Sequence, residues 1–193
     1  MSGKGELQEP YDPLSYQNLA RDVVRALLDQ PRGPLPPSRP FMGVGVYALY
    51  YTGGLDYYRS IRRRDIPIYV GSAVPAGKRK GAEVVVETGR TLYSRLTQHA
   101  RSITQTRNLS LADFRCRYLV VVPVWIGLAE RFLIEHYQPI WNTTVDGFGN
   151  HDPGSGRKNM KRPRWDILHP GRSWAKKLRA TESPDDIMNK LKG

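Results

Sequence analysis

The sequence predicts an α+β domain built on a small, mostly antiparallel three-stranded sheet flanked by helices. Stretches rich in valine and tyrosine alternate with stretches whose apolar residues recur at helical spacing. The length of 193 residues suits one domain with additions. Hydrophobic residues make up 39% of the chain, which is enough to form a buried core.

Three main strands are expected where Val, Ile and Tyr concentrate. In the first, residues 41–51, alternation predicts two opposite faces, one with Val44, Val46 and Ala48 and the other with Gly45, Tyr47 and Leu49. The second covers residues 66–71. The third covers residues 114–122, whose apolar run predicts burial on nearly both faces. Residues 84–86 are expected to form a short strand of their own.

Helices are expected at residues 15–30, 91–104, 126–138 and 184–191. Ser15 is a suitable N-cap for the first helix, and Pro139 ends the third. The prolines of residues 31–40 predict a stiff linker without regular structure. We therefore divide the chain into an N-terminal helical arm with its linker (1–40, of which 1–13 are expected to be mobile), a core (41–142) and a basic Gly/Pro-rich extension (143–193).

The charge balance favours an anionic partner. The chain has 30 Lys+Arg against 18 Asp+Glu, a net charge of +12, which is typical of nucleic-acid binding. A ribosomal or membrane-surface protein would share this charge. No apolar run is long enough to span a membrane, so a soluble, cytoplasmic protein is expected. The single cysteine, Cys116, excludes an internal disulfide and is expected in a strand core.

Arg95 and His99 lie four residues apart on a predicted helix and so project from the same face. A guanidinium beside an imidazole suits a phosphate oxygen and a proton-transfer path. The alternative is a solvated helix face. The apolar neighbours Leu92 and Leu96 place the pair at the edge of a buried surface, which favours a site.

Glu130 falls inside the apolar stripe of its predicted helix. A carboxylate in apolar surroundings needs compensation from a metal ion, from Arg95 or from hydrogen bonds. Tyr47 and Tyr69, on adjacent predicted strands, can point to the same face. Tyrosines in strands usually serve packing, and a tyrosine base would need a neighbour that lowers its pKa.

Together these residues resemble the GIY-YIG nuclease family. The resemblance rests on an ordered set of short motifs: Gly45-Val46-Tyr47, Tyr69-Val70-Gly71, Arg95-x-x-x-His99, Glu130 and Asn142. It covers roughly residues 43–142, about half the chain. The family fold is a small three-stranded antiparallel sheet flanked by helices, in agreement with the prediction above.

The resemblance implies a role for each of these residues. Glu130 would hold one divalent metal, Mg²⁺ with Mn²⁺ as a possible substitute, which would polarise the scissile phosphate. Arg95 would bind the growing phosphate charge. Tyr47, with His99 nearby, would take a proton from the attacking water, although either could be the actual base. Tyr69 would orient the water or a phosphate oxygen, and Asn142 would brace the site.

Basic segments around the motifs are candidates for DNA contact. Two are insertions relative to the family, and their alternative interpretation is solvated loops; the third is the extension. The candidate DNA-binding residues are Arg62, Arg63, Arg64, Lys78, Arg79, Lys80, Asn150, His151, Arg157 and Arg172.

Among family members the chain most resembles the type II restriction endonucleases, in the group cutting the GC-rich palindrome CCGCGG. This implies Mg²⁺-dependent cleavage of double-stranded DNA, a homodimer with one site per strand, a cognate DNA methyltransferase and a bacterial cytoplasmic location. The N-terminal helix is a candidate dimer contact. The alternatives are a structure-selective repair nuclease of the same family and a non-catalytic DNA-binding protein on this scaffold.

Overall fold

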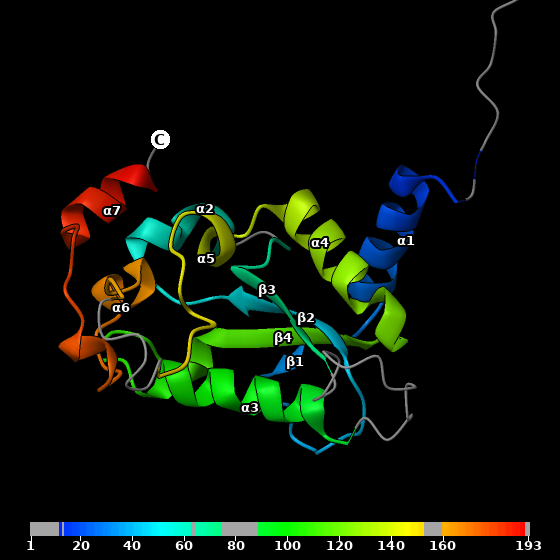
Figure 1. The fold of residues 1–193 in the computed structure, drawn as a ribbon, viewed down its shortest axis with the longest axis horizontal. Helices are drawn as coiled ribbons and strands as arrows, with labels where there is room; N and C mark the ends of the chain where they lie inside the picture. The colour runs from blue at the N-terminus through cyan, green and yellow to red at the C-terminus, as the bar shows by residue number, and fades with distance from the viewer. Residues whose placement is uncertain (1–11, 13, 63–64, 75–88, 153–159, 192–193) are drawn as a thin grey trace, which may run out of the picture.

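A four-stranded antiparallel sheet lies between helices in the computed structural model, which describes residues 12, 14–62, 65–74, 89–152 and 160–191 (Figure 1). The strand order is β1-β4-β2-β3. The strands are β1 (Gly33–Pro34), β2 (Gly45–Tyr51), β3 (Tyr69–Ala73) and β4 (Phe114–Val120). The helices are α1 (Tyr16–Leu28), α2 (Arg59–Arg62), α3 (Thr91–Thr104), α4 (Ile126–Tyr137), α5 (Ile140–Thr143), α6 (Arg164–Leu168) and α7 (Pro184–Lys190).

The predicted α+β class, the three main strands and the four main helices are confirmed. The fourth strand, β1, was not expected: Gly33 pairs with Cys116 and Pro34 with Arg115. The prediction that residues 31–40 lack regular structure was therefore wrong at these two positions. Proline is compatible with β1 because this strand lies at the edge of the sheet, where a missing N–H breaks no ladder. Residues 1–11 and 84–86 lie outside the described residues.

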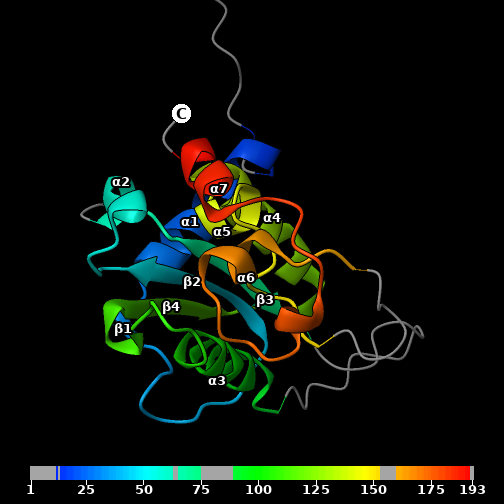
Figure 2. The same ribbon diagram turned by 90° about the vertical axis from the view of Figure 1, so that its left-hand side faces the viewer.

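The central strand β2 has the two faces that alternation predicts. Tyr47 and Leu49 belong to the cluster that α3 covers, whereas Val46 and Ala48 belong to the cluster that α4 and α1 cover. In Figure 2 these helices lie on opposite sides of the sheet. All seven residues of β2 are buried, so this strand forms the centre of both clusters.

Strand β4 differs from its prediction. Phe114 and Cys116 are buried on one face, whereas Arg115 on the other face is exposed and Arg117 and Leu119 beside it are half-buried, so this second face is partly open. Cys116 lies in the core as predicted, its thiol bonds to the Pro34 carbonyl oxygen at 3.1 Å, and burial raises the pKa of this thiol to about 12.

The N-terminal helix packs on the body of the protein. The Ser15 hydroxyl accepts a hydrogen bond from the Asn18 amide and so caps α1. Val24 and Leu27 are buried against the face that α4 also covers. Within the described ranges, no helix is both long and apolar enough to cross a bilayer.

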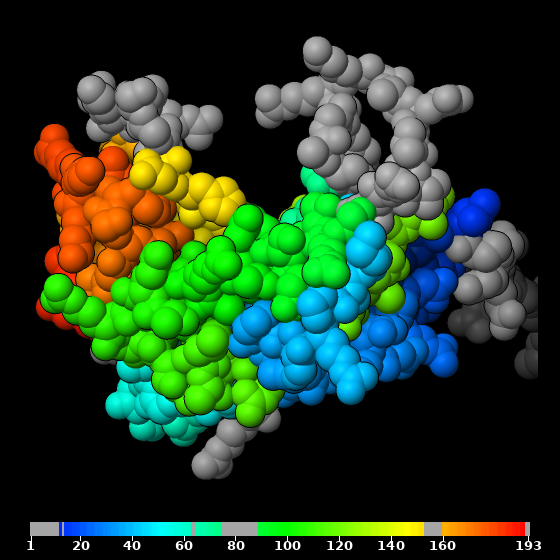
Figure 3. Space-filling model, turned by 90° about the horizontal axis from the view of Figure 1, so that it is seen from below, coloured from blue at the N-terminus to red at the C-terminus, as the bar shows by residue number. Residues whose placement is uncertain are grey.

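Two segments predicted as basic loops or extensions contribute to the core. Tyr58 and Ile61, from the insertion after β2, are buried, so this insertion is not simply a solvated loop. Trp165 and Ile187, from the C-terminal extension, share the cluster that contains Tyr47. Figure 3 shows this extension (orange) beside one end of α3 (green), where the Arg107 amide bonds to the Pro170 carbonyl.

Candidate active site

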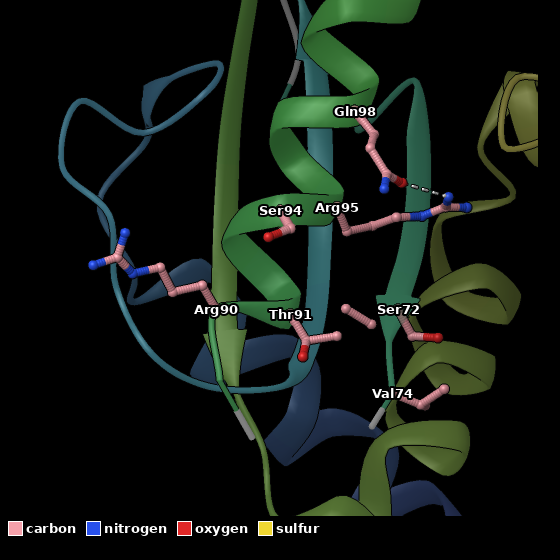
Figure 4. Close-up of a pocket in the computed structure, with 8 residues that line it drawn as sticks. Ser72, Val74, Arg90, Thr91, Ser94, Arg95 and Gln98 are labelled. Carbon is pink, nitrogen blue, oxygen red and sulfur yellow. Dashed lines mark hydrogen bonds between the residues drawn. The ribbon is translucent and has the colours of Figure 1, made fainter. Parts of the chain in front are cut away.

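An open groove of about 470 Å³ lies between the end of β3 and the N-terminal half of α3. It is lined by Ser72, Ala73, Val74, Arg90, Thr91, Ser94, Arg95 and Gln98. Figure 4 shows Arg95 extending from α3 and bonded to Gln98, with Ser72 across the groove on β3. The groove is polar and carries the predicted arginine, and it suits an anionic ligand.

Helix α3 holds Arg95 and His99 on one face because its apolar side anchors it to the sheet. Leu92, Leu96 and Ile103 are fully buried under the helix. His99 is only 2% exposed, whereas Arg95 is half-buried at the groove. The alternative of a solvated helix face therefore does not hold for His99.

The hydroxyl of Tyr47 and Nε2 of His99 form a buried hydrogen bond of 2.5 Å. Burial raises the pKa of Tyr47 well above 10.0. Burial, and then the charge of Arg95, hold the pKa of His99 well below 6.5. The resting pair is thus a protonated tyrosine and a neutral histidine, and the tautomer with its proton on Nδ1 leaves Nε2 free to accept.

Tyr69 lies on the neighbouring strand, with its ring centroid 6.2 Å from that of Tyr47 and 5.4 Å from that of His99. Burial raises the pKa of Tyr69, the Arg95 charge lowers it and the Glu130 charge raises it again. The same two charges act on Tyr47. Residues from β2, β3, α3 and α4 therefore converge on one electrostatic environment.

Glu130 lies at the edge of the apolar stripe of α4 and not inside it. Its neighbour Ala129 is buried while Glu130 is half-buried, so the expected carboxylate in apolar surroundings is corrected to a partly solvated one. Its Oε2 accepts a 2.8 Å hydrogen bond from the Ser72 hydroxyl. Among the residues that the structure describes, no Lys, Arg or His forms an ion pair with it.

The oxygens of Glu130 and Ser72 fit a hard divalent cation. Mg²⁺ keeps several waters and commonly binds through one or two carboxylates together with substrate phosphates. In the described part of the chain there is no cluster of three or more His, Cys, Asp or Glu that could form a closed metal cage. One carboxylate beside an open, polar groove fits the Mg²⁺ pattern and not that of a four-ligand structural site.

Asn142 clamps the strand that carries Tyr69. Its carboxamide oxygen accepts from the Val70 amide and its nitrogen donates to the Val70 carbonyl oxygen, both at 2.8 Å. Asn142 thus replaces a neighbouring strand at the free edge of β3. It supports the site without facing the groove.

Three residues of the extension complete the surroundings of the site. The ring of Phe148 stacks on the His99 imidazole, with centroids 4.5 Å apart and planes at 21°. The Gly149 carbonyl accepts from Nη2 of Arg95 at 3.1 Å, and His151 Nε2 contacts Nη1 of the same arginine. Phe148 and Gly149 were not predicted from the sequence, because no periodicity or motif spacing links them to α3.

Comparison with known proteins agrees with this arrangement. The family model described as Eco29kI GIY-YIG domain matches residues 39–192. The chain belongs to this GIY-YIG nuclease family. It is a family of restriction-type nucleases, so the resemblance to restriction enzymes is confirmed at that level. No curated protein matches the chain.

The match of the Eco29kI GIY-YIG domain includes the extension, in keeping with its packing in the core. Of the extension's candidate DNA-binding residues, Asn150 and His151 are exposed, and His151 lies beside Arg95. The prediction that Arg172 binds DNA was wrong: this residue is 2% exposed and paired with Asp166, so it cannot contact DNA.

Arg62 is the one remaining candidate among the described residues, and it does not line the groove. Arg62 ends α2, where its charge acts on Tyr51 at the end of β2 opposite Gly45, remote from Ser72. The others lie outside the described residues: Arg63, Arg64, Lys78, Arg79, Lys80 and Arg157.

Proposed function

We propose that this GIY-YIG protein is a type II restriction endonuclease that cuts both strands of DNA by metal-assisted phosphodiester hydrolysis. The observation that carries the proposal is that Tyr47, Tyr69, His99 and Glu130, from four elements, share one electrostatic environment with Arg95, which lines an open polar groove. The family membership supports the reaction class. The net charge of +12 supports a polyanionic substrate.

Arg95 and a cation held by Glu130 are proposed to bind the scissile phosphate. Arg95 lines the groove and provides a guanidinium suited to the charge that grows on the phosphate oxygens. Glu130, oriented by Ser72, would hold Mg²⁺, or Mn²⁺ in its place. When bound, the cation polarises the phosphate and stabilises the departing 3′ oxygen.

Tyr47 and His99 are proposed to act as one base. Water attacks phosphorus, the bond to the 3′ oxygen breaks, and the water proton passes to the Tyr47 oxygen as the phenol proton moves to His99 Nε2. The 2.5 Å bond provides this path, and the neutral state of His99 leaves it able to accept. In this scheme Tyr69 orients the water or a phosphate oxygen, and Asn142 braces β3.

A palindromic substrate requires one such site for each strand, so we propose a homodimer that acts on a short GC-rich palindrome, CCGCGG, with a cognate methyltransferase in a bacterial cytoplasm. The exposed face of α1 is the candidate dimer contact. These points extend the resemblance to the restriction enzymes of the family.

The deciding experiment compares Glu130→Gln with Glu135→Gln on a sequenced plasmid with Mg²⁺. Glu135 is a matched control because it lies on the same helix and is exposed, and among the described residues its carboxylate bonds to Tyr16 and Arg131, outside the groove. We expect wild type and Glu135→Gln to give the same discrete fragments, and Glu130→Gln or EDTA to give none.

The fragment ends identify the kind of nuclease. Ends that share one palindrome support the restriction enzyme and define its sequence. Cleavage confined to flaps or branched DNA would instead support a structure-selective nuclease. An intact plasmid that the wild-type protein still retards on a gel would support a non-catalytic DNA-binding protein and overturn the proposal.

A further inference from the structure

The guanidinium of Arg172 is buried, and all of its hydrogen-bond donors are satisfied. All five of its N–H groups form hydrogen bonds: two to the Asp166 carboxylate, and one each to the carbonyl oxygens of Gly147, Phe148 and Asn150, at 2.5–3.1 Å. Its plane lies between the rings of Trp165 and Trp174, 4.5 and 4.8 Å from their centroids. With no donor left, Arg172 cannot bind DNA.

The segment that Arg172 binds is the one that contacts the catalytic candidates. Within this segment, the Phe148 ring stacks on the His99 imidazole, and the Gly149 carbonyl accepts a hydrogen bond from Arg95. A Cβ added to Gly149 would lie 2.7 Å from the Tyr69 hydroxyl, so this backbone lies directly against the site.

We propose that Arg172, with Asp166, is a positioning residue: by holding Gly147–Asn150 it sets the orientation of Arg95 and the packing of His99. The expected effects on kcat rest on the proposed nuclease function, whereas the structural role of Arg172 does not. The guanidinium acts at a distance, through main-chain carbonyls, and does not line the groove.

The chemistry of the contact requires arginine. A buried charge costs several kcal/mol unless its partners satisfy it, and here one carboxylate and three carbonyls do so. A lysine would keep the charge, but its three donors cannot replace a planar fork with five. Arg172→Lys therefore tests geometry with charge retained.

The kinetic test measures kcat and KM for Arg172→Lys, with Arg162→Lys as the control. Arg162 also donates to two carbonyls of the extension, those of Ala175 and Lys176, but its side chain forms no hydrogen bond with Gly147–Asn150 in the described part of the chain. We expect kcat of Arg172→Lys to fall by up to about 100-fold with KM little changed, because small displacements of a catalytic group cost this much. Arg162→Lys should keep the wild-type kcat.

A double-mutant cycle separates positioning from loss of folded protein. In an Arg95→Lys background, a further Arg172→Lys should lower kcat by much less than 100-fold, because its target is already altered. Equal effects in both backgrounds would refute the positioning of Arg95 by Arg172. If Arg172→Lys does not fold, Gly149→Ala displaces the same segment without touching the buried pair, and unchanged kcat in that variant would also overturn it.

The proton NMR signals of His99 provide a readout that needs no cleavage. Stacked Phe148 shifts the His99 ring protons by its ring current; the chain has 4 histidines, so His→Gln variants assign them. Arg172→Lys should move the His99 signals towards random-coil values, and Arg162→Lys should not. This shift in a protein without nuclease activity would support positioning while refuting the proposed function, and its absence in folded Arg172→Lys would refute positioning alone.

Discussion

The Tyr47 side chain fills the space that a side chain at Gly71 would need: a Cβ added to Gly71 would lie 2.4 Å from the Tyr47 hydroxyl oxygen. The two residues face each other in the pairing of β2 with β3. The Tyr47 hydroxyl, which bonds to His99, passes over the Cα of Gly71, where no side chain blocks it. This explains why the glycine of one tripeptide and the tyrosine of the other belong together.

Replacing Gly71 with alanine should therefore displace the Tyr47 ring. We expect a loss of about 1–3 kcal/mol in the free energy of unfolding, as for overpacking, and at least a tenfold lower cleavage rate. Gly127→Ala, in α4, is the control, because nothing lies within 4 Å of its added methyl group and a helical alanine is favourable by roughly 0.5–1 kcal/mol. Urea unfolding and single-turnover cleavage measure both effects; a fully active Gly71→Ala would refute the close contact.

The Tyr47–His99 pair predicts the pH dependence of cleavage. Because the pKa of His99 is well below 6.5, its neutral form predominates throughout pH 7–9 and the single-turnover rate should be nearly constant there. A free tyrosinate base, whose pKa lies well above 10.0, would make the rate rise about tenfold per pH unit instead. Tyr47→Phe and His99→Gln should each lower the rate by about 10²–10⁴-fold. Retention of activity in either variant would remove that residue from the proton path.

Asn142→Asp should destabilise the protein through Val70. The variant keeps the acceptor for the Val70 amide but loses the donor to the Val70 carbonyl, which then faces a carboxylate oxygen. The expected cost is about 1–3 kcal/mol, that of an unsatisfied buried polar group. Asn189→Asp, on the exposed surface of α7, should be nearly neutral. Equal urea midpoints for the two variants would contradict the bracing role.

A second buried histidine predicts how stability depends on pH. His169 is 0% exposed, its ring nitrogens bond to Tyr58 and Asn108, and burial lowers its pKa from 6.5 to about 3. Below pH 6.5 the unfolded chain takes up a proton that the folded protein does not, so His169 makes the free energy of unfolding fall by about 1.4 kcal/mol per pH unit between pH 6.5 and 3.

This contribution should disappear in His169→Gln and persist in His136→Gln, whose residue is exposed on α4. Urea unfolding between pH 5.0 and 7.5 measures the slope. A wild-type slope in folded His169→Gln would show that the protons are taken up elsewhere.

Local sequence features predicted the secondary structure and the inner faces of the elements. Period-2 alternation placed Tyr47 opposite Val46, and helical spacing placed Arg95 and His99 on one face, because side-chain direction follows from backbone geometry alone. Motif order also predicted which residues meet: Tyr47 and His99 are 52 positions apart and share a hydrogen bond.

Only the tertiary structure decided what the arginines and carboxylates contact. Arg172 resembled a DNA-binding residue in a Gly/Pro-rich stretch, yet its donors are satisfied by Asp166 and by three carbonyls 22–25 positions away. Glu130 resembled a buried charge, yet it is half-buried and accepts a hydrogen bond from Ser72, which lines the open groove. Local spacing determines where a side chain points from its own element, whereas burial and partners depend on which distant segments pack against it.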